Sequence, residues 1–168
     1  LLIRMRTKKM KNNPKSIRTG VINVTASLPV HPSLRYGFRP LDRILYIVIH
    51  HAGVDADPTP EQTARYHVET NGWPGIGYHF AIMRDGTVYQ TNWLTTLSYH
   101  VSGHNQESVG ILLNGDFREG RGPTQAQFQS LFVFLIPELI AQLGDHVEVK
   151  AHKELSATSC PGDWWVEE

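Results

Sequence analysis

The stretch ILYIVIHH, residues 44–51, decides the fold. It is a short apolar run rich in β-branched residues, which is typical of a strand buried inside a sheet. It ends in two histidines, and successive side chains of a strand point to opposite faces. Only one of His50 and His51 is therefore expected to join any single site, and that site would lie at the end of a core strand.

The segment that follows predicts a helix. Residues 57–72, DPTPEQTARYHVETNG, offer Thr59 as N-cap and Pro60 at the first helical position. Gln62 stands three residues after the cap, which completes a capping box. The helix is expected to stop at Asn71-Gly72.

Further strands are expected on both sides of this helix. Residues 78–91, YHFAIMRDGTVYQT, are two strand-like runs joined by Asp85-Gly86, which is a strong hairpin signal. Residues 108–117, SVGILLNGDF, predict another buried strand, and residues 146–152, HVEVKAH, predict the last one. The segment 21–30, VINVTASLPV, predicts a short strand near the start.

A second helix is expected between the last two strands. In residues 123–144, PTQAQFQSLFVFLIPELIAQLG, Thr124 and Gln127 have capping-box spacing and Gly144 marks the end. Pro137 is expected to kink or break this helix. Strands that alternate with helices predict an α/β fold, with one sheet covered by helices.

The length and composition are those of a single globular domain. The chain has 168 residues, 40% of them hydrophobic, and a single cysteine, which cannot form an internal disulfide. No apolar run is judged long enough to span a membrane, and the opening Leu1–Met5 is too short for the apolar region of a secretory signal. A monomer is the default expectation.

The net charge of zero hides an asymmetry along the chain. Residues 1–40 hold nine of the 16 basic side chains and none of the 16 acidic ones, so the rest carries seven basic against 16 acidic. We expect residues 1–40 to be a basic arm and linker, and residues 41–168 to be the functional domain. The arm suits contact with a polyanion, either a nucleic acid or a phosphate-rich wall polymer, and the alternative is a merely solvated tail.

Candidate metal ligands stand where two strands end. One of the paired histidines at 50 and 51, His152 after the last strand, and Cys160 eight residues later would together provide two imidazoles and one thiolate. Such a set binds zinc and leaves a fourth position for water, which is the arrangement of catalytic sites.

Other interpretations stay open on the residues alone. The histidines could instead be satisfied core or surface residues and the cysteine a packing residue, or Cys160 could act as a nucleophile with His152 or His50 as its base. His100 and His104 have the spacing of a helical chelate, but Gly103 between them favours a loop.

Five motifs in order give the chain a family likeness. The segments IVIHHAG, GWPGIGYHFAIMRDGTVYQ, HVSGHNQESVGILLNGDF, TQAQFQSL and AHKELSATSCPGD cover roughly residues 43–165. In this they resemble the type 2 N-acetylmuramoyl-L-alanine amidases, a group that includes bacteriophage endolysins and peptidoglycan recognition proteins. The resemblance implies a mixed sheet flanked by helices, with a zinc ion at one end of the sheet.

The resemblance also implies roles for particular residues. It implies that His50, His152 and Cys160 bind zinc and that His51 points away. Tyr78 would orient the attacking water or stabilise the oxyanion, and Thr158 would be a secondary stabiliser in place of a catalytic lysine. Residues in loops beside the cleft would contact substrate, namely Trp73, Tyr99, His100, His104 and Asn105, whereas His79 is expected to be a buried strand histidine.

The implied activity is hydrolysis of the amide between N-acetylmuramic acid and L-alanine in peptidoglycan. The alternative is a peptidoglycan-binding recognition module without catalysis. The expected cofactor is Zn²⁺, the expected partner is peptidoglycan, with anionic wall polymers for the arm, and no nucleic acid is expected. The place of action would be the bacterial cell wall, reached by a phage-released endolysin or a secreted autolysin.

Overall fold

The computed structural model describes residues 20–166, and the first half of the predicted arm lies outside these residues. A six-stranded sheet forms the centre, in the order β1-β5-β4-β7-β3-β8. Only β4 and β5 run antiparallel, and every other neighbouring pair is parallel. The prediction of a mixed sheet flanked by helices is confirmed.

The predicted strands form the middle of this sheet. β3 (Tyr46–His51) lies between β7 (Ser108–Leu113) and β8 (Glu148–Ala151), and both neighbours are parallel to it. The Asp85-Gly86 turn joins β4 (Phe80–Ile82) to β5 (Val88–Gln90), as predicted. Gly86 has a φ of 88°, which suits glycine at this turn.

Residues 20–40, expected to belong to the arm and linker, pack on the domain. β1 (Ile22–Asn23) pairs with β5, while β2 (Gly37–Phe38) pairs with β6 (Thr96–Leu97) in a separate two-stranded sheet. The strand predicted over 21–30 is shorter than expected, because the Asn23 side chain accepts hydrogen bonds from the Thr25 amide and hydroxyl and turns the chain.

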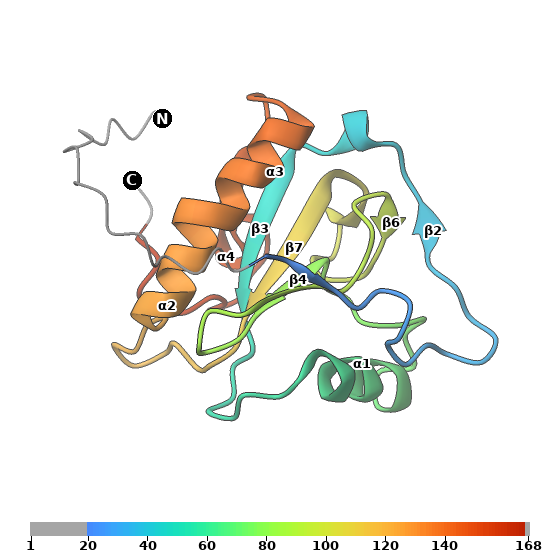
Figure 1. Ribbon diagram of the computed structural model, residues 1–168, viewed down its shortest axis with the longest axis horizontal. Coiled ribbons are helices and arrows are strands. Elements are labelled where there is room, and N and C mark those ends of the chain that lie inside the picture. Colours follow the sequence, from blue (N-terminus) through green and yellow to red (C-terminus); the bar gives the residue numbers. More distant parts are fainter. Residues whose placement is uncertain (1–19, 167–168) are drawn as a thin grey trace.

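α1 (Pro60–Glu69) confirms the first predicted helix. Thr59 caps it in a full capping box with Gln62, and the helix leads through Thr70 to Gly72 at a φ of 67°. Ala64 and His67 are buried on its inner side, three residues apart. Figure 1 shows α1 on the opposite side of the sheet region from the long helical segment 125–143.

The second predicted helix continues through Pro137 without ending there. α2 (Gln125–Phe128), a π-helical segment (Gln129–Leu135) and α3 (Ile136–Leu143) form one helical rod that runs alongside β3 (Figure 1). Leu131, Leu135 and Leu139 pack into the same core as the β3 and β7 side chains. Short elements complete the chain, namely η1 (Leu41–Arg43), η2 (Asn105–Glu107) and α4 (His152–Leu155).

The rod also corrects the expectation about membrane spans. Residues Gln125–Leu143 are long and apolar enough to cross a membrane by length and composition, and they are the one such helix among residues 20–166. A core helix passes the same test, and the leucines of this one pack against the sheet.

Candidate metal centre and active site

Two neighbouring strands bring His50 and His152 together. His50 stands near the end of β3 and is 1% exposed. Ile49 pairs with Ala151 at the end of β8, so the residues that follow, His50 on β3 and His152 at the start of α4, lie side by side. Their ring centroids are 4.6 Å apart. The register of the sheet thus positions both imidazoles.

The loop after α4 returns Cys160 to the same place. The Lys153 amide donates a hydrogen bond to the Cys160 carbonyl at 2.8 Å, which ties the loop to α4. Cys160 Sγ lies 3.8 Å from His50 Nδ1 and accepts a hydrogen bond from the His51 backbone amide at 3.4 Å. The single cysteine therefore faces the two histidines.

These three side chains form a cluster that suits zinc. Each offers one ligand atom, and the three atoms lie within 4.8 Å of one another. Nitrogen and sulfur ligands on a tetrahedral zinc ion are roughly 3.5 Å apart, close to the 3.8 Å between His50 Nδ1 and Cys160 Sγ. His51 points to the other face of the sheet, where its Nδ1 accepts the Phe117 amide at 3.0 Å.

Burial controls the protonation of the cluster. It holds the pKa of His50 well below its usual value, with a further contribution from His152, and it also lowers the pKa of His152. Burial raises the pKa of the Cys160 thiol to about 11. A reactive nucleophilic cysteine needs a lowered pKa, so these surroundings favour a metal ligand, whose cation would remove the proton.

Tyr78 lies against the cluster just ahead of β4. Its ring centroid is 5.2 Å from that of His50. Its carbonyl accepts hydrogen bonds from the Thr91 hydroxyl and the Asn92 amide, both at 2.7 Å, which anchor its backbone. Burial, and then the nearby Cys160, raise the pKa of its hydroxyl. The hydroxyl thus keeps its proton and can act as a hydrogen-bond donor.

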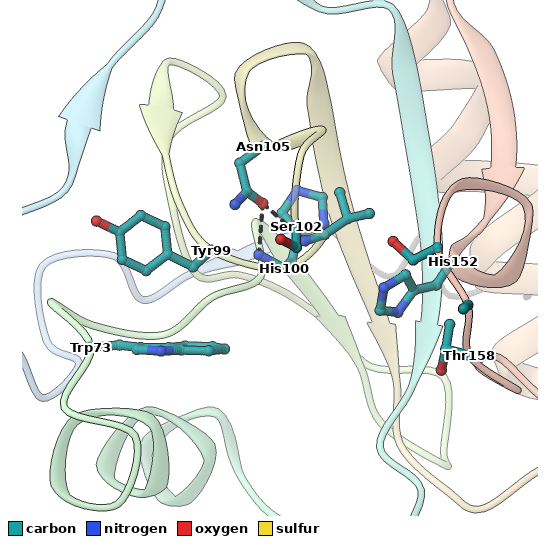
Figure 2. Close-up of a pocket in the computed structure, with 10 residues that line it drawn as sticks. Trp73, Tyr99, His100, Ser102, Asn105, His152 and Thr158 are labelled. Atoms are coloured by element: carbon teal, nitrogen blue, oxygen red, sulfur yellow. Dashed lines mark hydrogen bonds between the residues drawn. The ribbon is translucent and has the colours of Figure 1, made fainter.

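An open cleft of about 430 Å³ adjoins the cluster at His152. Figure 2 shows Trp73 and Tyr99 on one side, with His152 and Thr158 on the other. His100 and Asn105 lie between the two sides. The ring centroids of Trp73 and Tyr99 are 6.1 Å apart in an edge-on arrangement, so this side of the cleft is aromatic.

Not all of the predicted substrate contacts lie in the cleft. Trp73, His100 and Asn105 line the cleft, whereas His104 does not and instead contacts Glu107 at 2.7 Å through Nδ1. Asn105 uses its side-chain oxygen to accept the amides of His100 and Val101. His100 is buried and its Nδ1 lies 3.0 Å from His50 Nε2.

Two further predicted residues have clear surroundings. Thr158 is exposed at the cleft, and its hydroxyl oxygen accepts the Cys160 amide at 3.2 Å, which leaves the hydroxyl proton available for donation. His79 is buried, as expected. Its Nδ1 accepts the Gly110 amide at 3.1 Å and its Nε2 lies 2.9 Å from the Thr96 carbonyl.

His67 belongs to the same region and was not singled out in the sequence. Its ring centroid is 4.8 Å from that of Trp73 and 5.6 Å from that of Tyr78. Its Nδ1 accepts the Gly77 amide at 3.0 Å, and burial lowers its pKa to about 4. His67 lies three residues after Ala64 on the inner face of α1, and this helical spacing could have predicted from the sequence that His67 faces the interior.

The fold is an α/β domain with a cluster that could hold a metal ion at one end of its sheet, and comparison with known proteins identifies the family. A family model described as N-acetylmuramoyl-L-alanine amidase matches residues 40–163. The chain belongs to the N-acetylmuramoyl-L-alanine amidase family.

Individual relatives are moderately similar. The endolysin of Klebsiella phage KP32 is 37% identical over 109 residues, which are 60% of this chain and 70% of the relative. The human N-acetylmuramoyl-L-alanine amidase is 29% identical over 154 residues, covering 80% of this chain but only 26% of the human protein. The chain therefore spans about a quarter of the length of that relative.

A solved structure agrees with this assignment. The endolysin and N-acetylmuramoyl-L-alanine amidase LysCS from Clostridium intestinale URNW has a TM-score of 0.72 and 30% identity. The alignment covers 86% of this chain and 88% of that one.

Proposed function

We propose that this protein is a zinc-dependent N-acetylmuramoyl-L-alanine amidase. It hydrolyses the amide between N-acetylmuramic acid and the first L-alanine of the peptidoglycan stem peptide, and it acts at the bacterial cell wall. The observation that carries the proposal is the cluster of His50, His152 and Cys160 beside an open cleft, which His152 lines. The amidases and endolysins among its relatives support the reaction type.

Metal binding, hydrogen-bond donation and substrate contact would fall to different residues of the site. His50, His152 and Cys160 would hold the zinc ion, which supplies Lewis-acid activation of water and of the scissile carbonyl. Partial burial raises the pKa of the Tyr78 hydroxyl, so the phenol keeps its proton and would donate a hydrogen bond to the oxygen that becomes negative. Thr158 at the cleft edge would add a second, uncharged donor. Trp73 and Tyr99 would contact the sugar or stem peptide with their ring faces.

The basic N-terminal arm would concentrate the enzyme on anionic wall polymers, and this contact should weaken at high salt. Arg39, the last basic residue of the predicted arm, is an exception. It is 3% exposed and its guanidinium donates hydrogen bonds to the carbonyls of Asn105 and Leu94. This arginine stabilises the fold and is not available to a polyanion.

A recognition module without catalysis is the second candidate, because peptidoglycan recognition proteins are also among the relatives. The test is to incubate the protein with purified peptidoglycan, with and without a chelator, and to identify the new chemical ends. We expect L-alanine amino termini that appear only when metal is present, without new reducing sugars. Wall binding with no new ends, even after zinc is restored, would establish the recognition module instead.

A matched pair of variants tests whether the reaction depends on the metal cluster. Cys160→Ala should abolish both zinc binding and the release of amino termini, because two imidazoles alone do not complete the set. Ser159→Ala changes the exposed neighbour of the same loop and should preserve both properties. Equal activity of the two variants would rule out Cys160 as a ligand.

A further inference from the structure

A third histidine, His100, lies behind the metal cluster. His100 Nδ1 is 3.0 Å from His50 Nε2, and the two rings meet edge to face with centroids 5.2 Å apart. His50 has its other nitrogen, Nδ1, on the side of Cys160 Sγ. The two nitrogens of His50 thus face different partners, one in the cluster and one behind it.

The surroundings of His100 determine which nitrogen carries the proton. His100 Nε2 lies 3.4 Å from the Ser108 carbonyl and 3.3 Å from Ser108 Oγ. The Ser108 hydroxyl gives its own proton to the His104 carbonyl at 2.7 Å, so Oγ is left as an acceptor. Because both partners of Nε2 are acceptors, His100 carries its proton on Nε2 and presents a lone pair at Nδ1.

This arrangement sets the tautomer of His50. A lone pair at His100 Nδ1 requires a proton on His50 Nε2 to complete the hydrogen bond. His50 Nδ1 is then unprotonated and directed toward Cys160, which is the state that a metal ligand needs. A neutral imidazole carries one proton, so a proton on Nε2 of each ring leaves Nδ1 of that ring as a lone pair.

The chain builds a dedicated place for the His100 ring. Gly110 on β7 lies under it, and a Cβ there would come within 2.7 Å of the imidazole. The backbone amide of His100 is held by Asn105 Oδ1 at 2.9 Å, and Arg39 in turn binds the Asn105 carbonyl. Strand, loop and N-terminal segment therefore combine to keep one imidazole in one position.

We propose that His100 is a positioning residue, which orients His50 and fixes its tautomer so that Nδ1 binds the metal. Partners of this kind are worth about 10- to 100-fold in metal affinity. The inference gives His100 a role beyond the expected contact with substrate. It rests on the proposed function, because the metal concerned is the zinc of the amidase.

The test measures zinc affinity of the full chain by competition with a chromophoric chelator, at one pH. His100→Ala should weaken zinc binding by about 10- to 100-fold. His100→Asn should restore most of the affinity, because the asparagine oxygen can accept the His50 proton near the place of the imidazole nitrogen. His104→Asn, in the same loop but in contact with Glu107 rather than His50, is the control and should bind zinc as the wild type does.

Nitrogen NMR of the metal-free wild type supplies a second readout that needs no variant. We expect His50 and His100 to be neutral with their protons on Nε2, and a coupling across the hydrogen bond between them. Wild-type zinc affinity in His100→Ala, or a proton on Nδ1 of His50, would overturn the inference while leaving the amidase intact. Failure of the wild type to bind zinc would instead remove the proposed metal centre, and with it any ligand for His100 to position.

Discussion

Tyr78 shows how burial selects the chemistry of a single side chain. Its hydroxyl keeps its proton because burial raises its pKa, and its ring lies against His50. The tyrosine can thus offer a hydrogen bond to a developing negative charge without taking part in metal binding. This separates its contribution from that of the three cluster residues.

Replacing Tyr78 by Phe should lower kcat by about 100- to 1,000-fold, the loss typical of one oxyanion donor. Zinc affinity should stay at the wild-type value, since the ring and its packing remain. The measurement is kcat on purified muramyl peptide together with a zinc titration. Tyr66→Phe, on the exposed side of α1, is the matched control and should leave both unchanged. A Tyr78→Phe enzyme with normal kcat would contradict the assigned role.

The lone cysteine has a physical explanation at the same scale. Its thiol is half-buried between His50 and the His51 amide, and this partial burial raises its pKa to about 11. A thiol in such a place is inert as a nucleophile unless a cation deprotonates it. Its position is therefore better suited to binding a metal than to attacking a substrate.

The long C-terminal helix shows how an element tolerates a residue that should interrupt it. Pro137 has no amide proton and normally costs about 3 kcal/mol or more inside a helix. Here the preceding segment is π-helical, and the Ile136 amide reaches back to the Leu131 carbonyl five residues earlier. The wider turn accommodates the proline, while the buried leucines on the rod supply apolar burial that outweighs the local cost.

Variants on the two sides of this rod should differ sharply in stability. Leu139 is 1% exposed and packs in the core, so Leu139→Ala should lower the free energy of unfolding by about 2–5 kcal/mol. Val133 is 74% exposed, so Val133→Ala should change the free energy of unfolding by no more than about 0.5 kcal/mol. Urea denaturation of both variants checks this. Similar losses would mean that the outer face of the rod is covered by a partner in solution.

Across the whole molecule, buried neutral histidines should make the fold sensitive to acid. Six histidines have lowered pKa values in the described part of the chain, with burial as the largest cause in each case: His50, His51, His67, His79, His100 and His152. Below about pH 6.5 the unfolded chain binds protons that the folded chain does not. Stability should therefore rise with pH through this window and be lost as the pH falls toward 4.

His67 gives a measurable share of this effect. Its pKa moves from 6.5 to about 4, which corresponds to about 3 kcal/mol of stability lost between pH 7 and pH 4. His67→Asn keeps an acceptor for the Gly77 amide but cannot be protonated. As the pH is lowered, its free energy of unfolding should therefore fall less steeply than that of the wild type, and the two slopes should differ by up to about 1.4 kcal/mol per pH unit. Chelator-treated protein, unfolded in urea at several pH values, provides the comparison. Parallel pH profiles for variant and wild type would show that His67 does not titrate on unfolding.

Local sequence signals were sufficient for most of the elements. β3, α1 with its capping box, the Asp85-Gly86 hairpin and β7 follow from patterns within a few residues, because propensity, capping and turn chemistry act over that range. The same signals placed polar groups at the ends of β3 and β8. Period-two alternation alone separated His50 from His51.

Contacts between distant segments needed the tertiary structure. The pairing of β1 with β5, the π-helical route through Pro137 and the burial of Arg39 all depend on partners remote in the sequence. The contact between His50 and His100 is of the same kind, since it requires β3, the loop before β7 and a glycine beneath the ring.

The sequence by itself thus predicted which residues are candidate ligands and, through its family motifs, the type of metal site. Only the tertiary structure decided which imidazole nitrogen faces the cluster, what holds it there, and which aromatic side chains form the cleft. The physical reason is that ligand identity is carried by residue type and spacing, whereas proton position and packing depend on neighbours that the fold brings together from far along the chain.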